Sequence, residues 1–416
     1  MEKIFVLTLA FWGMCLSSVS AQVQDSKIDL ELIYQKVDEA IAQSPQYVAE
    51  YEKQLNKQKS LFLGETDPEK KLQIGMGLFE MYRSFKNDSA LYYISRCITM
   101  ADNLGESALA GHARARMARQ CSNSGMYVEA GELLRQVNSS VLSKEGKTDY
   151  YEACNHLYGE IANYSLVSEV KSRYYNLQRL YRDSLESVSD EGSNTYLMIK
   201  MWELLGQNKV HEALKISDIW MNRVGENTRD DAMASYFRHI VYAYLGDSIM
   251  VRYWLGKSAL ADIKCAVMDQ ASLITLAEKA NDDGETERSY KYIRFTWDCN
   301  NFFNTRMRSS QISPVLNVIE QNYQDVASRN TRILAIASFV FVSLTVLLFL
   351  FFFYTYRQKR QLSKTKKELQ DANEQLLESN SRLKRMNDWV TQCNKELFDI
   401  NEKLKQENSF PPGVSQ

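Results

Sequence analysis

Histidine is the residue type that most often binds metals or acts as a catalytic base, and it is scarce in this chain. The four histidines are His112, His156, His211 and His239, and no two of them have the spacing of an HExxH metal site. We expect His211 in a turn and His239 on a helix face, as surface or satisfied core residues. The histidines therefore indicate neither a metal site nor a catalytic base.

Cysteine could provide a nucleophile, a disulfide framework or a zinc site. The chain has seven cysteines, of which Cys15 lies in an N-terminal apolar segment and Cys393 lies near the C-terminus. The remaining five are odd in number and none forms a CxxC pair, so we expect buried free thiols rather than disulfides or zinc ligands. These five are Cys97, Cys121, Cys154, Cys265 and Cys299.

No phosphate-binding or hydrolase motif occurs in the sequence. GxSxG, GxxxxGK[ST] and the protein-kinase signatures are absent. The acidic pairs Asp230-Asp231 and Asp282-Asp283 are typical of turns and helix caps. No histidine follows Tyr354, which excludes a phosphate-accepting sensor kinase. We predict a protein that is not an enzyme and that has no catalytic, cofactor-binding or metal-binding residues.

Composition favours helices throughout. The 416 residues include only 5 prolines and 17 glycines, and the net charge of −2 gives no signal for polyanion binding. One motif, GMYVEAGELL from Gly125 to Leu134, recurs in FKNDSALYYI, NKVHEALKIS, GDSIMVRYWL and GETERSYKYI. A small or branched residue recurs at the same place in each copy, with a period of about 38–40 residues and one double interval. The aligned residues are Ala90, Ala130, Ala213, Val251 and Ser289.

This pattern is similar to the tetratricopeptide (TPR) repeat, a helix–turn–helix unit. The double interval predicts a degenerate repeat near Lys171, and small residues allow two helices to approach closely. We therefore predict an all-α fold, with capping helices over 22–67 broken at Pro45 and a TPR-like array over 68–310. Such an array should form an elongated superhelix whose concave face binds a peptide or protein partner, although a pure spacer is the alternative.

Two apolar segments predict export and a membrane anchor. Residues 1–21 resemble a secretory signal peptide, and 333–355 form an uncharged segment long enough to cross a bilayer after a juxtamembrane linker over 311–332. A basic cluster follows the span, which places the C-terminus in the cytoplasm and the repeats in the periplasm of an inner-membrane protein. We interpret this cluster as a topology anchor on anionic lipid: Arg357, Lys359, Arg360, Lys364, Lys366 and Lys367.

The segment 356–408 has the period of a coiled coil. An apolar residue recurs every seven positions, at Leu362, Leu369, Leu376, Leu383, Val390, Leu397 and Leu404, and asparagine recurs at Asn373, Asn380, Asn387, Asn394 and Asn401. A strict seven-residue repeat predicts a left-handed coiled coil, here a homodimer. The sequence does not decide whether the leucines are a or d. If they are d, the asparagines occupy a, where they fix register and weaken pairing.

The complete layout resembles a family of membrane-bound TPR transcriptional regulators of Bacteroidota, from about Ile28 to Asn408. The matching pieces are Ser258-Ala259, Ala261-Asp262, Ser272-Leu273, Gly284, Tyr290 to Ile293, and Phe303-Asn304 with Arg306. Family members continue into a helix-turn-helix-like DNA-binding domain, whereas here Pro411 and Pro412 end the helix in a short tail, 409–416, that we expect to be disordered. The resemblance therefore implies signalling, without nucleic acid as a partner of this chain.

We accordingly predict a single-span sensor or interaction protein with no cofactor. Its periplasmic repeats would bind a peptide or protein, and its cytoplasmic coiled coil would pair two copies. The alternatives are a structural envelope scaffold and a dimer partner of a full-length regulator.

Overall fold

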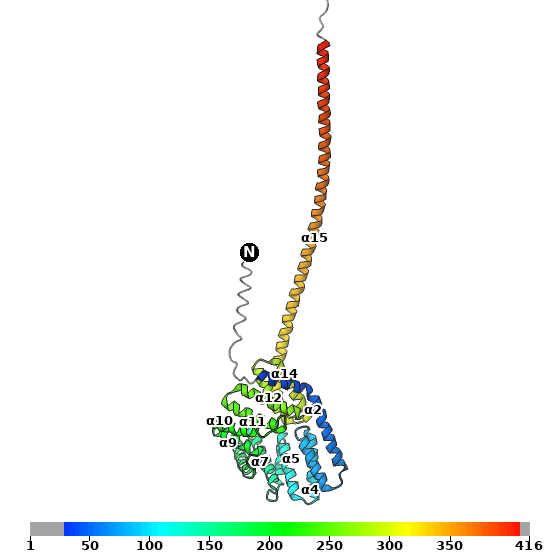
Figure 1. Ribbon diagram of the computed structural model, residues 1–416. Coiled ribbons are helices and arrows are strands. Elements are labelled where there is room, and N and C mark those ends of the chain that lie inside the picture. The colour runs from blue at the N-terminus through cyan, green and yellow to red at the C-terminus, as the bar shows by residue number, and fades with distance from the viewer. Residues whose placement is uncertain (1–28, 408–416) are drawn as a thin grey trace, which may run out of the picture. The chain divides into compact units, whose positions relative to one another are not determined.

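The computed structural model describes residues 29–407, and every regular element among them is an α-helix (Figure 1). The predicted signal peptide, 1–21, and the predicted tail, 409–416, lie outside the described residues. The chain divides into two units, the first ending at Val326 and the second beginning at Ala327. The all-α fold class is confirmed.

Twelve helices of the first unit form six successive antiparallel pairs between α2 (Leu30–Gly64) and α15 (Arg306–Glu407). Each pair packs against the next along the chain. The pairs are α3 (Pro68–Tyr82) with α4 (Asn87–Asn103), α5 (Ser107–Asn123) with α6 (Tyr127–Arg135), α7 (Lys144–Tyr164) with α8 (Ser168–Val188), α9 (Asn194–Gly206) with α10 (Val210–Met221), α11 (Arg229–Leu245) with α12 (Ser248–Lys264), and α13 (Ala271–Asp282) with α14 (Thr286–Phe303).

The predicted repeat register is confirmed. Ala90, Ala130, Ala213, Val251 and Ser289 each lie in the second helix of a pair, and all are buried. The degenerate repeat is the pair α7 and α8, and Lys171 lies in α8. A small side chain at this place lets the second helix pack closely against its partner, which explains why the position remains recognisable while its surroundings vary.

Four of the six turns inside the pairs contain a residue in the left-handed backbone conformation. Gly125, Gly246 and Gly284 have φ values of 83°, 76° and 79°, between α5 and α6, α11 and α12, and α13 and α14. Asn208 takes this place between α9 and α10 with φ 58°. Glycine adopts this region without steric cost and asparagine at low cost, so these residues end the first helix of these four pairs sharply.

The N-terminal cap is one continuous helix. We predicted a break at Pro45, but α2 includes Pro45 in its interior. Proline removes one backbone hydrogen bond, and packing on both sides of that point offsets the loss. Val37 and Ala40 are buried before the proline, and Leu55 and Phe62 are buried after it. At about 1.5 Å per residue, α2 spans about 52 Å.

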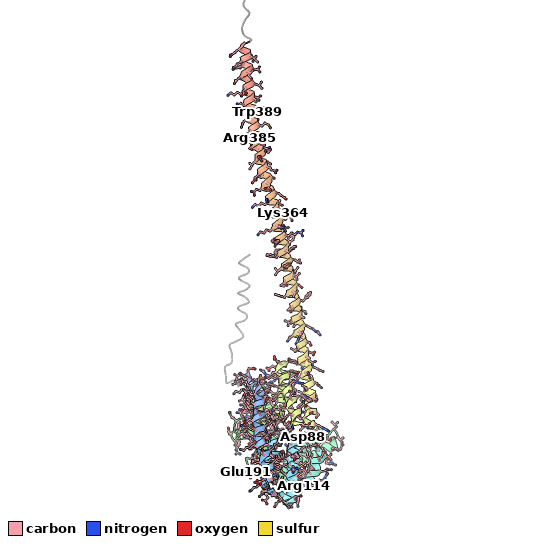
Figure 2. The ribbon with its side chains drawn as sticks, turned by 90° about the vertical axis from the view of Figure 1, so that its right-hand side faces the viewer. Asp88, Arg114, Glu191, Lys364, Arg385 and Trp389 are labelled. Atoms are coloured by element: carbon pink, nitrogen blue, oxygen red, sulfur yellow. The ribbon has the colours of Figure 1, made fainter. Side chains whose placement is uncertain are left out.

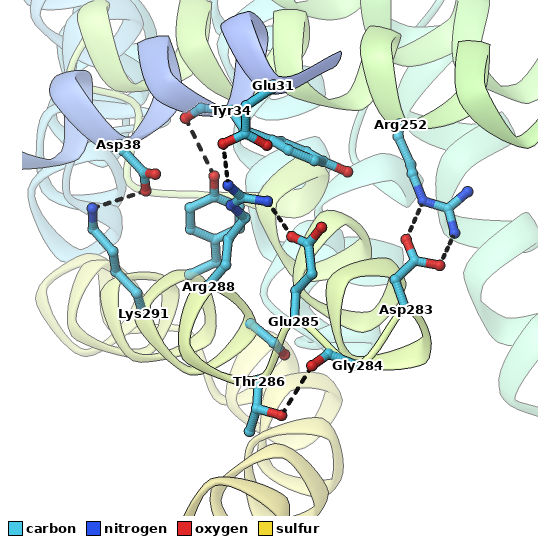
Figure 3. A network of polar contacts seen from close by, with 12 residues as sticks. Glu31, Tyr34, Asp38, Arg252, Asp283, Gly284, Glu285, Thr286, Arg288 and Lys291 are labelled. Atoms are coloured by element: carbon cyan, nitrogen blue, oxygen red, sulfur yellow. Dashed lines mark hydrogen bonds and ion pairs between the residues drawn. The ribbon is translucent and has the colours of Figure 1, made fainter. Parts of the chain in front are cut away.

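This length lets α2 connect the two ends of the array. Its first turns pack against α12, where Ile33 lies next to Gly256, and they form ion pairs with α14 (Figure 3). Arg288 Nη2 is 2.6 Å from Glu31 Oε1, and Lys291 Nζ is 2.8 Å from Asp38 Oδ1. The later part of α2 packs against α3.

The first repeat also contacts the last repeats directly. The backbone N–H of Met268 donates to the carbonyl of Ser84 at 2.8 Å, and Asn304 Nδ2 donates to Asp88 Oδ2 at 2.7 Å. Phe85 and Phe303 share one buried cluster. The array therefore closes on itself, which corrects our expectation of an elongated superhelix. Because the closing contacts join segments more than 180 residues apart, the repeat pattern carries no trace of them.

The first turns of α15 belong to the repeat unit. Ile312, Leu316 and Ile319 are buried in the same cluster as α12 to α14, and Tyr323 stacks on Tyr290 with ring centroids 4.1 Å apart. The segment that we expected to be a linker, 311–332, is thus helical, and its first half is part of the packed domain.

The second unit consists of the rest of α15. An 18-residue window of α15 has a mean hydropathy of 2.8 and no buried residue, so by length and composition this helix could cross a membrane. Beyond the apolar segment, the side chains of α15 are almost all exposed in the single chain, and Lys364, Arg385 and Trp389 project from it (Figure 2).

Candidate functional site: a polar cavity inside the closed array

A concave feature with charged walls lies within the closed array. It is a cavity of about 620 Å³ formed by the first helices of several pairs, by the loop before α13 and by the start of α15. Its charged lining comprises Arg83, Arg116, Arg119, Arg229, Arg308, Asp149, Glu152, Asp230, Asp262 and Asp269. Phe79, Tyr236 and Phe237 provide aromatic surface. A volume of this size matches small-molecule or short-peptide sites, which are roughly 300–1,000 Å³.

Helix α5 places two arginines on the cavity wall. Arg116 and Arg119 are three residues apart and therefore lie on one helix face. Arg116 pairs with Glu80 and lies 3.3 Å from Asp149, which in turn accepts a 2.6 Å hydrogen bond from His112. These contacts connect α3, α5 and α7 along the wall and hold Arg116 in place.

Helix α12 contributes the carboxyl of Asp262 to the cavity. Burial raises the pKa of Asp262 to about 8, and the nearby Asp269 carboxylate adds to this effect while Arg229 opposes it. Asp262 is therefore largely protonated at neutral pH. Ser258 and Ser272 lie beside it in the lining, where their hydroxyls are 2.6 Å apart and Ser258 donates to the carbonyl of Ala232.

Helix α15 contributes Arg308 to the cavity. Its Nε donates to Asp269 Oδ1 at 2.6 Å, and its Nη1 donates to Gln311 Oε1 at 2.7 Å. Gln311 in turn donates to the hydroxyl of Tyr164 at the end of α7, at 2.7 Å. The preceding Met307 packs on Gly125, in the turn between α5 and α6. The first turns of α15 thus contact elements from widely separated repeats.

The structure does not bring the four histidines together at one site. His112 borders the cavity through Asp149, and His156 lies 2.8 Å from the hydroxyl of Ser122. His239 is buried against Tyr236, and burial lowers its pKa to about 4. His211 is exposed in the first helical turn of α10, where we expected a non-helical turn. Among residues 29–407, no group of three metal-ligating side chains comes together.

The cysteines and acidic pairs lie where the sequence placed them. Burial raises the pKa of four free thiols to about 12, those of Cys97, Cys121, Cys154 and Cys299, while Cys265 is half-buried. Asp230 and Asp231 lie in the first turn of α11. Asp283 follows α13 and holds Arg252 through two hydrogen bonds of 2.7 and 2.6 Å.

The predicted seam and anchor residues lie together on the second unit, apart from the cavity. All are on α15, and all are exposed in the single chain. The seam residues Leu362, Leu369, Leu376, Leu383, Val390, Leu397 and Leu404 are between 42% and 72% exposed. The asparagines at 373, 380, 387, 394 and 401 and the basic residues from Arg357 to Lys367 are also exposed.

Our sequence reasoning did not find the cavity residues. One signal was available, since HARARMARQ concentrates three arginines in the first helix of a repeat. First helices line the inner face of such arrays, so Arg116 and Arg119 could have been assigned to that face. Arg229 and Asp262 carried no comparable signal, because closure of the array brings them into the cavity.

The helix pairs, their register and the internal cavity define the protein as a tetratricopeptide-repeat domain, a fold that mediates interactions. More particularly, the family model described as the SusR N-terminal TPR domain matches residues 41–314, and the chain belongs to this family. No curated protein matches the sequence.

Proposed function

We propose that this protein is a single-span membrane sensor that binds a peptide or protein segment in the cavity and transmits the binding through α15. The observation that carries the proposal is the double role of Arg308. Its side chain lines the cavity, and its backbone belongs to the helix that contains the apolar segment. A ligand that competes for Asp269 or Arg308 would act directly on α15.

The membership of the SusR-type TPR family supports this proposal at the level of class. A TPR domain is an interaction fold without a catalytic role, so we propose binding rather than turnover. By its relation to signal-responsive transcriptional regulators, the protein would take part in regulation. We place the repeats in the periplasm and the C-terminus in the cytoplasm, because the basic residues from Arg357 to Lys367 follow the apolar segment.

The second part of the proposal is a homodimer through the end of α15. An exposed apolar stripe with a strict seven-residue period favours a partner helix with the same period. A second copy satisfies this condition in register. If the leucines are d, each asparagine at a would lie opposite its own counterpart. Polar residues in such a seam weaken the pair, so that a modest input from the cavity could shift it.

Cysteine cross-linking of the full chain in membranes tests this coupling. Leu383→Cys, combined with Cys393→Ser, reports the pairing of α15 through the rate of disulfide formation. We expect Arg308→Ala to change this rate and Arg96→Gln to leave it unchanged, because Arg96 is exposed on α4 and lies outside the cavity lining. Equal rates in all three backgrounds would refute the coupling and would favour a structural scaffold.

A further inference from the structure

Three arginines of the cavity have no hydrogen bond to a carboxylate, unlike the other two. Arg229 donates only to the backbone carbonyl of Glu80, at 3.4 Å. The Nε of Arg83 is 3.5 Å from Glu80 Oε2, and the Nε of Arg119 is 3.5 Å from Glu152 Oε1, which are long for charge-assisted hydrogen bonds. The Nη1 of Arg119 donates to Asn123 Oδ1, while its Nε is buried and without a hydrogen-bond partner.

The three guanidinium groups also affect one another. Burial lowers the pKa of Arg119 and of Arg229, and the positive charge of Arg83 lowers both further, while Glu152 opposes the shift at Arg119. Burial of an unpaired cation is costly, and like charges at short range add to that cost. Proteins maintain such an arrangement at sites where a ligand completes the charge pairing.

The cavity acids do not complete it. Asp269 is engaged by Arg308 and Asp149 by Arg116 and His112, while Asp262, beside Arg229, is largely protonated at neutral pH. Glu152 lies 3.5 Å from the Nε of Arg119, and Asp230 is exposed to solvent. Arg83, Arg119 and Arg229 therefore keep N–H groups that no carboxylate engages at short range.

We propose that Arg83, Arg119 and Arg229 bind an oxyanion group of the ligand, a carboxylate or a phosphate. This inference rests on the proposed function in one respect, since it assigns the chemistry of the same cavity. Guanidinium groups suit either oxyanion, because their N–H groups match the spacing of its oxygens. An acidic peptide side chain, a C-terminal carboxylate and a phosphate ester all provide this chemistry.

Titration of the purified full chain in detergent micelles, at constant ionic strength, tests the proposal. The probes are glutarate, its uncharged diamide glutaramide, and inorganic phosphate, with binding measured by calorimetry. We expect at least one anion to bind and glutaramide not to bind. Because each charge-assisted hydrogen bond contributes about 1.5–3 kcal/mol, Arg229→Gln should weaken anion binding about tenfold or more.

The variants should fold, because Arg229→Gln and Arg83→Gln each remove an unpaired or weakly paired charge. Arg96→Gln is the matched control, since it removes an exposed arginine outside the cavity. Binding of glutarate alone would identify a carboxylate ligand, and binding of phosphate alone a phosphate ester. Absence of anion binding by the wild type, or equal weakening by Arg96→Gln and Arg229→Gln, would overturn the proposal.

The two proposals fail independently. The cross-linking rates compare Arg308→Ala with the wild type without added ligand, so a cavity that binds no anion leaves that result intact. Conversely, anion binding that depends on Arg229 would stand even if Arg308→Ala left the cross-linking rate unchanged.

Discussion

The attachment of α15 to the repeats can be tested at Ile312. This side chain is fully buried in the cluster that includes Leu273 and Tyr292, whereas Val318, further along the same helix, is 54% exposed. Ile312→Ala removes three buried carbon atoms, and at about 0.8 kcal/mol each their transfer to water amounts to about 2.4 kcal/mol. The cavity left behind adds to this, so we expect a loss of about 3–4 kcal/mol in the free energy of unfolding.

Val318→Ala is the matched control on the same helix. It removes exposed carbon atoms and introduces the residue with the best helix propensity, so the free energy of unfolding should change by no more than about 0.5 kcal/mol. Urea unfolding of the full chain in detergent micelles, followed by tryptophan fluorescence, measures both variants. Hydrogen exchange over 306–323 then reports whether the first turns of α15 loosen locally.

Equal stability of the two variants would contradict the burial of Ile312 against the repeats. That result would mean that the start of α15 does not pack on the repeats and that Arg308 cannot couple the cavity to this helix. Loss of stability in Ile312→Ala, with faster exchange confined to 306–323, would instead support α15 as a separately movable element of the domain.

Three further outcomes are expected. Gly256→Leu should destabilise the protein by about 1–3 kcal/mol, because even a Cβ at this position would lie 2.9 Å from Ile33. Gly77→Leu is the control and should not destabilise it, since no side chain lies near Gly77. Thermal unfolding compares the two variants. Relative to Asp262→Asn, the wild type should lose free energy of unfolding as the pH rises toward and through about 8, because the carboxyl of Asp262 favours the folded state only while it is protonated. Urea titrations across this pH range measure the difference in free energy between the two proteins. A difference that does not change with pH would contradict the raised pKa of Asp262. Iodoacetamide should modify the half-exposed Cys393 long before the buried thiols of Cys97, Cys121, Cys154 and Cys299. Mass spectrometry of the folded chain measures the order of modification.

The repeat array could be predicted because its signal is local. Close packing of two helices requires a small residue such as Ala90 or Ala130, and the turn before the second helix requires a residue such as Gly125 in the left-handed conformation. Both requirements recur in several units and survive the variation of other positions. The same locality explains the apolar segment of α15, since its length and lack of charge are properties of consecutive residues.

The closure of the array could not be predicted in this way. It depends on pairs such as Glu31 with Arg288, which are 257 residues apart, and on the continuation of α2 through Pro45. Proline predicts a helix break from local stereochemistry, but buried residues on both sides of Pro45 outweigh that preference. The cavity could not be predicted for the same reason, because Arg229 and Arg83 become neighbours only when the last repeats pack against the first.

Closure also determines which element a ligand could move. Opening the array would expose the large apolar cluster that joins α2 to α12 and α14, at a cost far above the 1–3 kcal/mol of a typical coupling between sites. Exchange of the polar pairs made by Arg308 and Gln311 costs much less, since each replaced hydrogen bond contributes about 1–3 kcal/mol and a ligand can restore it. A ligand shifts an equilibrium only by its differential affinity for the two states. We therefore expect binding to act on the first turns of α15 while the repeats around them keep their arrangement.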